Sequence, residues 1–135
     1  MTAIVDSSAL VAYLLEESGF EGVRDILAAG ASSPGFLIAE SANAILEASK
    51  SRRVDAETAT KAIGAMRGLV ERSNIKLYPE EDLVEGAFRI ALEHDLTVYD
   101  SLFLALAQKL EGSLVSRDRK QMEAALRLGI DVLGA

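Results

Sequence analysis

The sequence predicts an α/β fold, a three-layer α/β/α structure with a mainly parallel sheet. Short apolar and β-branched runs alternate along the chain with longer segments in which apolar residues recur every three or four positions. Alternation of this kind is typical of a parallel sheet covered by helices on both faces. The 135 residues, 50% of them hydrophobic, suit a single domain over 1–135 with its own core.

The chain is expected to begin with a strand and two helices. Apolar and β-branched residues at 2–5 predict a buried strand that stops at Asp6. Ser7 or Ser8 can cap the helix that follows, and a Ser-Gly pair breaks it. Amphipathic spacing predicts a second helix over about 20–29, which a glycine ends.

A short strand and two more helices come next. The segment 31–33 has low strand propensity, so any strand there must be very short. Pro34 is tolerated at an early helix position because its missing N–H would have no partner there, and the helix that it opens runs to about Ser51. Asp55 is expected to cap the helix over 56–72.

The second half of the chain continues the alternation of strands and helices. Strands are expected at 75–78, 113–116 and 130–133, with a short extended stretch at 96–99. Helices are expected at about 80–94, 100–111 and 119–128. The apolar stripes of 56–72 and 80–94 favour core over interface, although a partner could also use them.

Composition narrows the class of protein. The net charge of −7 argues against a broad basic nucleic-acid surface and agrees with a carboxylate-rich site whose charge a cation offsets. The absence of cysteine excludes disulfides and thiolate sites, and one histidine, His94, argues against structural zinc. We expect no signal peptide and no membrane span, and therefore a cytoplasmic protein.

Four acidic residues fall where such a fold binds ligands. Asp6 and Asp118 follow strand ends, which line the crevice of open α/β sheets, and Asp100 lies at a helix start. Glu40 lies on a largely apolar helix with no basic residue before Lys50, so its carboxylate needs another cation. Oxygen ligands suit Mg²⁺ or Mn²⁺. Asp100 and Asp118 could instead be ordinary helix N-caps.

Four segments resemble, in order, the motifs of the PIN-domain family. They are Ile4-Val5-Asp6-Ser7-Ser8, Pro34 to Glu40 with Asn43, Tyr99 to Ala107, and Ser116-Arg117-Asp118. The resemblance covers essentially the whole chain and implies a five-stranded parallel sheet. It also implies catalytic, metal-binding roles for Asp6, Glu40, Asp100 and Asp118, with Asn43 and Ser116 supporting them through hydrogen bonds.

The small family members that the chain resembles are VapC-like ribonuclease toxins of type II toxin–antitoxin systems. The resemblance therefore implies a Mg²⁺- or Mn²⁺-dependent endoribonuclease that hydrolyses RNA phosphodiester bonds. It also implies a cognate antitoxin protein as a partner, and a homodimer. The alternative is a non-catalytic PIN module that binds RNA or a protein partner, and metal-dependent cleavage of RNA separates the two.

Basic residues beside two of the acids are candidate RNA contacts. They are Arg117, Arg119 and Lys120 around Asp118, and Lys50, Arg52 and Arg53 after the helix of Glu40. They could equally be solvated charges at helix ends. Three other α/β classes fit less well. A receiver domain needs a late lysine, a haloacid-type phosphatase needs an Asp where Ser8 stands, and a dinucleotide binder needs a glycine-rich first turn.

Overall fold

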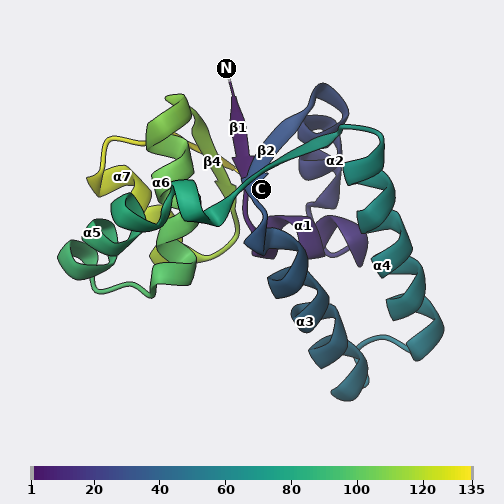
Figure 1. Ribbon diagram of the computed structural model, residues 1–135. Helices are drawn as coiled ribbons and strands as arrows, with labels where there is room; N and C mark the ends of the chain where they lie inside the picture. The colour runs from purple at the N-terminus through teal and green to yellow at the C-terminus, as the bar shows by residue number, and fades with distance from the viewer. Residues whose placement is uncertain (1, 135) are drawn as a thin grey trace.

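The computed structural model describes residues 2–134, which form a parallel sheet between two layers of helices (Figure 1). The strands are β1 (Ala3–Val5), β2 (Ala31–Pro34), β3 (Ile75–Tyr78), β4 (Ser113–Ser116) and β5 (Val132–Gly134). Their order across the sheet is β3-β2-β1-β4-β5, and every neighbouring pair is parallel. The predicted α/β/α class and the five-stranded parallel sheet are confirmed.

Helices cover both faces of this sheet. They are α1 (Ser7–Leu14), α2 (Phe20–Ala29), α3 (Phe36–Lys50), α4 (Ala56–Glu71), the 3-10 turn η1 (Glu80–Asp82), α5 (Val84–His94), α6 (Val98–Leu110) and α7 (Arg119–Arg127). Helices α1 to α4 lie on one side of the sheet and α5 to α7 on the other (Figure 1). Right-handed crossovers require this division, because the chain moves toward one edge through β3 and then returns to β4 and β5. Among the described residues, no helix combines the length and apolar character needed to cross a membrane.

The strand order reverses between β1 and β4. These two neighbours pair directly, with Ile4 opposite Leu114 and Val5 opposite Val115. The connection from β1 leads away to one side of the sheet, and the connection from β4 leads to the other. Ligands of open α/β sheets bind beyond the carboxyl ends of the strands at such a point. The fold therefore places a crevice directly after β1 and β4.

The polar strand β2 fits the core because the buried hydroxyl group of Ser33 has a hydrogen-bond partner. All four of its residues are buried, although its sequence is Ala-Ser-Ser-Pro. The hydroxyl group of Ser33 donates a hydrogen bond of 2.8 Å to the carbonyl oxygen of Val5 in the adjacent strand. Because a buried hydroxyl costs little once it is hydrogen-bonded, low strand propensity does not prevent the strand from forming here.

The start of α1 differs from the prediction. Asp6, rather than Ser7 or Ser8, is the N-cap, and its carboxylate accepts a 3.0 Å hydrogen bond from the backbone N–H of Ala9. Asp118 likewise caps α7, as one of the two interpretations of that residue expected. An acid at a helix cap and an acid in a site are therefore not exclusive alternatives in this fold.

Two other predicted helix starts are wrong. Pro34 ends β2 instead of opening a helix, because it is paired in register with Tyr78 of β3 and α3 begins only at Phe36. The stretch expected to be extended over 96–99 is cut short, because α6 starts at Val98. Thr97 caps α6, accepting a hydrogen bond from the N–H of Asp100, so Asp100 is not a cap.

One helix exposes part of its apolar stripe. The helix predicted over 80–94 is divided into η1 and α5, and it buries Leu83, Ala87 and Ile90. Its outer face exposes Val84 at 46%, Phe88 at 57% and Leu92 at 71%. The core interpretation of this stripe is therefore correct for one side of the helix and wrong for the other.

Candidate active site

A cavity of about 400 Å³ lies beyond the carboxyl ends of β1 and β4. All four acids expected from the sequence line it: Asp6, Glu40, Asp100 and Asp118. Each acid comes from a different helix, at the start of α1, in the second turn of α3, in the first turn of α6 and at the cap of α7. Other side chains on its wall include Ser7, Ser8, Glu17, Arg53, Arg117 and Gln121.

Asp6 is the most buried of the four acids, with 4% of its surface exposed. One carboxylate oxygen accepts a 2.7 Å hydrogen bond from the hydroxyl of Ser8, and the other accepts one from the hydroxyl of Ser116. Burial raises the pKa of Asp6, these donors and the Ala9 N–H lower it, and the charge of Asp118 raises it again. The carboxylate is therefore oriented by hydrogen bonds but is costly to ionise.

Glu40 lies half-buried on α3 and faces the other acids. The hydroxyl of Ser7 donates a hydrogen bond to its carboxylate. Burial raises the pKa of Glu40, the Ser7 bond lowers it, and the negative charges of Asp100, Asp6 and Asp118 raise it further. Repulsion from three separate carboxylates shows that the four acids share one electrostatic environment.

Gln121 connects the two remaining acids, and sequence reasoning missed it. Its side-chain amide donates a 2.9 Å hydrogen bond to the carbonyl oxygen of Asp100, while its backbone N–H donates to the carboxylate of Asp118 at 3.3 Å. Burial first, and then the charge of Asp118, raise the pKa of Asp100, whereas nearby Lys120 lowers it. Gln121, only 3% exposed, thus fixes α6 relative to α7 at the site.

The donor set suits a hard divalent cation, although no cluster is preformed. Carboxylate and hydroxyl oxygens are the ligands that Mg²⁺ and Mn²⁺ prefer. Raised pKa values from burial and mutual repulsion indicate negative charge that a cation would stabilise. Within residues 2–134, however, no three acidic or histidine side chains are arranged so that they could hold one ion as they stand. The carboxylates of Asp6 and Glu40 instead accept hydrogen bonds from serine hydroxyl groups.

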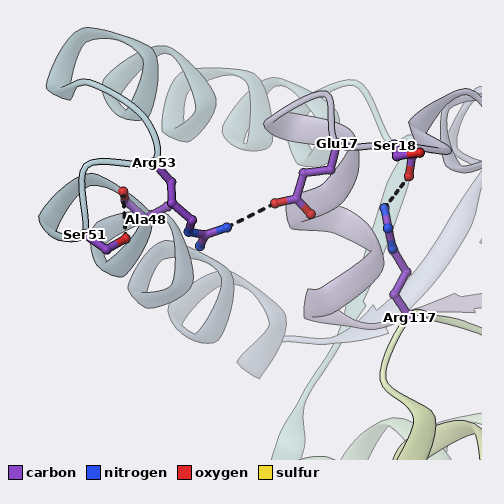
Figure 2. Close-up of polar contacts among 6 residues, drawn as sticks. All are labelled: Glu17, Ser18, Ala48, Ser51, Arg53 and Arg117. Carbon is purple, nitrogen blue, oxygen red and sulfur yellow. Dashed lines mark hydrogen bonds and ion pairs between the residues drawn. The ribbon is translucent and has the colours of Figure 1, made fainter.

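Two arginines on the cavity wall are held by the turn between α1 and α2 (Figure 2). The guanidinium group of Arg53 lies 3.4 Å from the carboxylate of Glu17, and that of Arg117 donates a 2.7 Å hydrogen bond to the carbonyl oxygen of Ser18. The Arg53–Glu17 pair is largely exposed and therefore adds little stability. Glu17 is a fifth acid at the cavity, which no motif in the sequence indicated.

The structure places some of the other predicted site residues at the cavity and others away from it. Ser116 does bond to Asp6, as a supporting residue should. Asn43 is exposed on α3 and is not on the cavity wall. Of the six basic residues proposed for RNA contact, Arg53 and Arg117 line the cavity, and Lys120 acts on Asp100 through its charge. Exposed positions outside the cavity wall are occupied by Lys50, Arg52, Arg119 and Lys120.

The raised pKa values of Asp6, Glu40 and Asp100 predict an unusual dependence of stability on pH. A carboxyl whose pKa is higher in the folded than in the unfolded chain binds protons more tightly when folded. Without divalent metal, the free energy of unfolding should therefore rise as pH falls through these raised values toward the ordinary 3.8 of Asp and 4.5 of Glu.

Urea unfolding in EDTA checks this expectation. The midpoint should be higher at pH 5 than at pH 7, and the difference should shrink in Glu40→Gln, which removes one of the titrating groups. A midpoint that falls steadily between pH 7 and pH 5 would show that the acids are not destabilising in the free protein.

Three comparisons with known proteins agree with this architecture. A family model described as "PIN domain" matches residues 3–126. Ribonuclease VapC3 of Pyrobaculum aerophilum is 30% identical over 125 residues, which cover 91% of this chain and 94% of that protein. The crystal structure of PAE2754 from the same organism superposes with a TM-score of 0.70 and 21% identity, covering 99% of this chain and 89% of that one. This last likeness concerns the fold alone.

Proposed function

The chain belongs to the PIN-domain family, and on that premise we propose that it is a Mg²⁺- or Mn²⁺-dependent endoribonuclease that hydrolyses RNA phosphodiester bonds. The observation that carries the proposal is the convergence of Asp6, Glu40, Asp100 and Asp118 on one cavity. The relative named as a ribonuclease supports the reaction class. We further propose that the chain is the toxin of a toxin–antitoxin pair.

The four acids would hold the metal. Once bound, the ion would offset negative charge on the phosphate and make an attacking water more acidic. The chain's own groups prepare for this: Ser8 and Ser116 orient the carboxylate of Asp6, and Gln121 fixes the backbone of Asp100. A cation held there would offset both the burial and the mutual repulsion that raise the pKa values of Asp6 and Glu40.

RNA would meet local positive charge at the rim of an acidic protein. Arg53 and Arg117 lie on the cavity wall and could each contact a phosphate beside the cleaved bond. Lys120 lies near enough to Asp100 for its positive charge to lower the pKa of that carboxyl. Since the net charge is −7, these contacts would act only near the site and would position the strand without binding RNA broadly.

The proposed partners are a cognate antitoxin protein and a second copy of the chain. The exposed face of α5 with Val84, Phe88 and Leu92 offers apolar surface that either could cover. An antitoxin-controlled ribonuclease would act in the cytoplasm, where its RNA substrates are found.

Cleavage of a panel of structured RNAs by the purified chain tests the proposal. Cleavage should require Mg²⁺ or Mn²⁺, stop when EDTA is added and return when the metal is restored in excess. A correctly folded chain that leaves every RNA intact in the presence of either metal would favour the non-catalytic module instead.

A further inference from the structure

Two aromatic rings are stacked next to the acidic cavity. The ring centroids of Phe36 and Tyr99 lie 4.9 Å apart, with an angle of 22° between the ring planes. Phe36 is the first residue of α3, and Tyr99 lies in the first turn of α6. The stack therefore joins the two helices that carry Glu40 and Asp100.

The stack lies beside two of the acids but outside the wall of their cavity. Phe36 precedes Glu40 by four residues, so the two side chains lie on the same face of α3. Tyr99 directly precedes Asp100 in α6. Neither ring is on the cavity wall. A nucleic acid strand whose phosphate lay at the four acids would therefore place a neighbouring nucleotide near these rings.

The two rings differ in exposure. Phe36 is half-buried and packs against the main hydrophobic core. Tyr99 has 58% of its surface open to solvent although its ring is stacked on Phe36. Within the described part of the chain, its hydroxyl group makes no hydrogen bond. The arrangement is an open ring supported from behind by a second ring that the core holds in place.

We propose that Tyr99, backed by Phe36, is a stacking platform for an unpaired nucleobase adjacent to the scissile phosphate. This rests on the proposed function and narrows its substrate class to RNA with unpaired nucleotides at the cleavage site. Proteins recognise unpaired bases by stacking them on aromatic side chains, and each such stack contributes appreciably to affinity. Stacking needs no positive charge, so it suits a chain with a net charge of −7.

A kinetic test uses two RNAs that differ only by removal of one base beside the cleavage site. Removing the stacked base should lower the kcat/KM of the unaltered protein about tenfold, the size expected for one base–aromatic stack. Tyr99→Ala should lose a similar factor on the intact RNA and show no further loss on the abasic one, because the two changes remove the same contact. Tyr99→Phe, which keeps the ring, should restore the discrimination.

The matched control is Leu126→Ala, which removes an apolar side chain that is 63% exposed on α7 and lies outside the acidic cavity. It should discriminate between the two RNAs as the unaltered protein does. If Tyr99→Ala lowers kcat/KM equally on both RNAs, or on neither, the stack is only a contact between α3 and α6 and the platform is refuted. Urea midpoints of all variants identify any loss caused by unfolding.

A binding measurement separates this inference from the proposed function. The chain contains no tryptophan, so Tyr99→Trp introduces one tryptophan, whose fluorescence can be excited selectively, at the platform. In EDTA, a short unpaired oligoribonucleotide should quench this fluorescence, while the tryptophan of Leu126→Trp should stay unquenched. Quenching without RNA cleavage would keep the platform and overturn the nuclease. Cleavage without quenching would overturn the platform alone, and the absence of both would overturn both.

Discussion

Asp100→Asn is expected to lower metal-dependent RNA cleavage by at least about 100-fold. Loss of a residue that merely supports a metal ligand costs roughly 10- to 100-fold, so loss of a ligand should cost no less. The fold should survive, because Asp100 is only half-buried and its backbone remains held by Thr97 and Gln121. Removing the charge also removes repulsion with Asp118, so stability in EDTA should not fall.

Single-turnover cleavage at saturating Mn²⁺ measures this effect. Asp55→Asn is the matched control, because Asp55 is an exposed N-cap of α4 outside the cavity, and asparagine caps helices equally well. It should cleave RNA as the unaltered chain does. If the activity of Asp100→Asn lies within a few-fold of the activity of the control, Asp100 is not a metal ligand.

Phe103→Ala is expected to lower the free energy of unfolding by about 3–5 kcal/mol, the usual cost of emptying a buried phenylalanine site. Phe103 is 1% exposed in the middle of α6, and it also forms part of the cavity wall. A domain is commonly stable by only about 5–15 kcal/mol, so this loss should leave the variant marginal.

Equilibrium unfolding in urea at constant pH gives this difference. Phe88→Ala makes the same chemical change at a position that is 57% exposed, and it should cost less than about 1 kcal/mol. Equal losses in the two variants would mean that α6 does not lie against the sheet as described.

Local sequence patterns were sufficient to predict most helices and strands. They were not sufficient to predict where one element ends and the next begins. Alternating apolar runs predicted the strands at 75–78 and 113–116 with the bounds that the structure has. Pro34 was misplaced because the rule for proline at helix starts considers one helix alone. In the fold, Pro34 extends the pairing of β2 with β3, a contact between segments far apart in the chain. No local pattern could have indicated that pairing.

The same limit applies to the site. The acids could be predicted because the carboxylate at a strand end or on an apolar helix is conspicuous in the sequence. Gln121 could not, because its amide bonds to Asp100 on another helix at no fixed sequence spacing. Glu17 was missed for a similar reason, since its relation to the cavity depends on how the turn after α1 folds over Arg53. Asn43 has the expected sequence position but is exposed on α3.

The adjacency of β1 and β4 has a consequence for how the chain is made. Asp6 is synthesised before Asp118 and before the strand β4 that precedes Asp118, although β1 and β4 are neighbours in the sheet. A nascent chain that still has β4 inside the ribosome can present at most three of the four acids to the solvent. A nuclease built on this plan would therefore be unable to assemble its full cutting centre beside the translation machinery until β4 and Asp118 have left the ribosome.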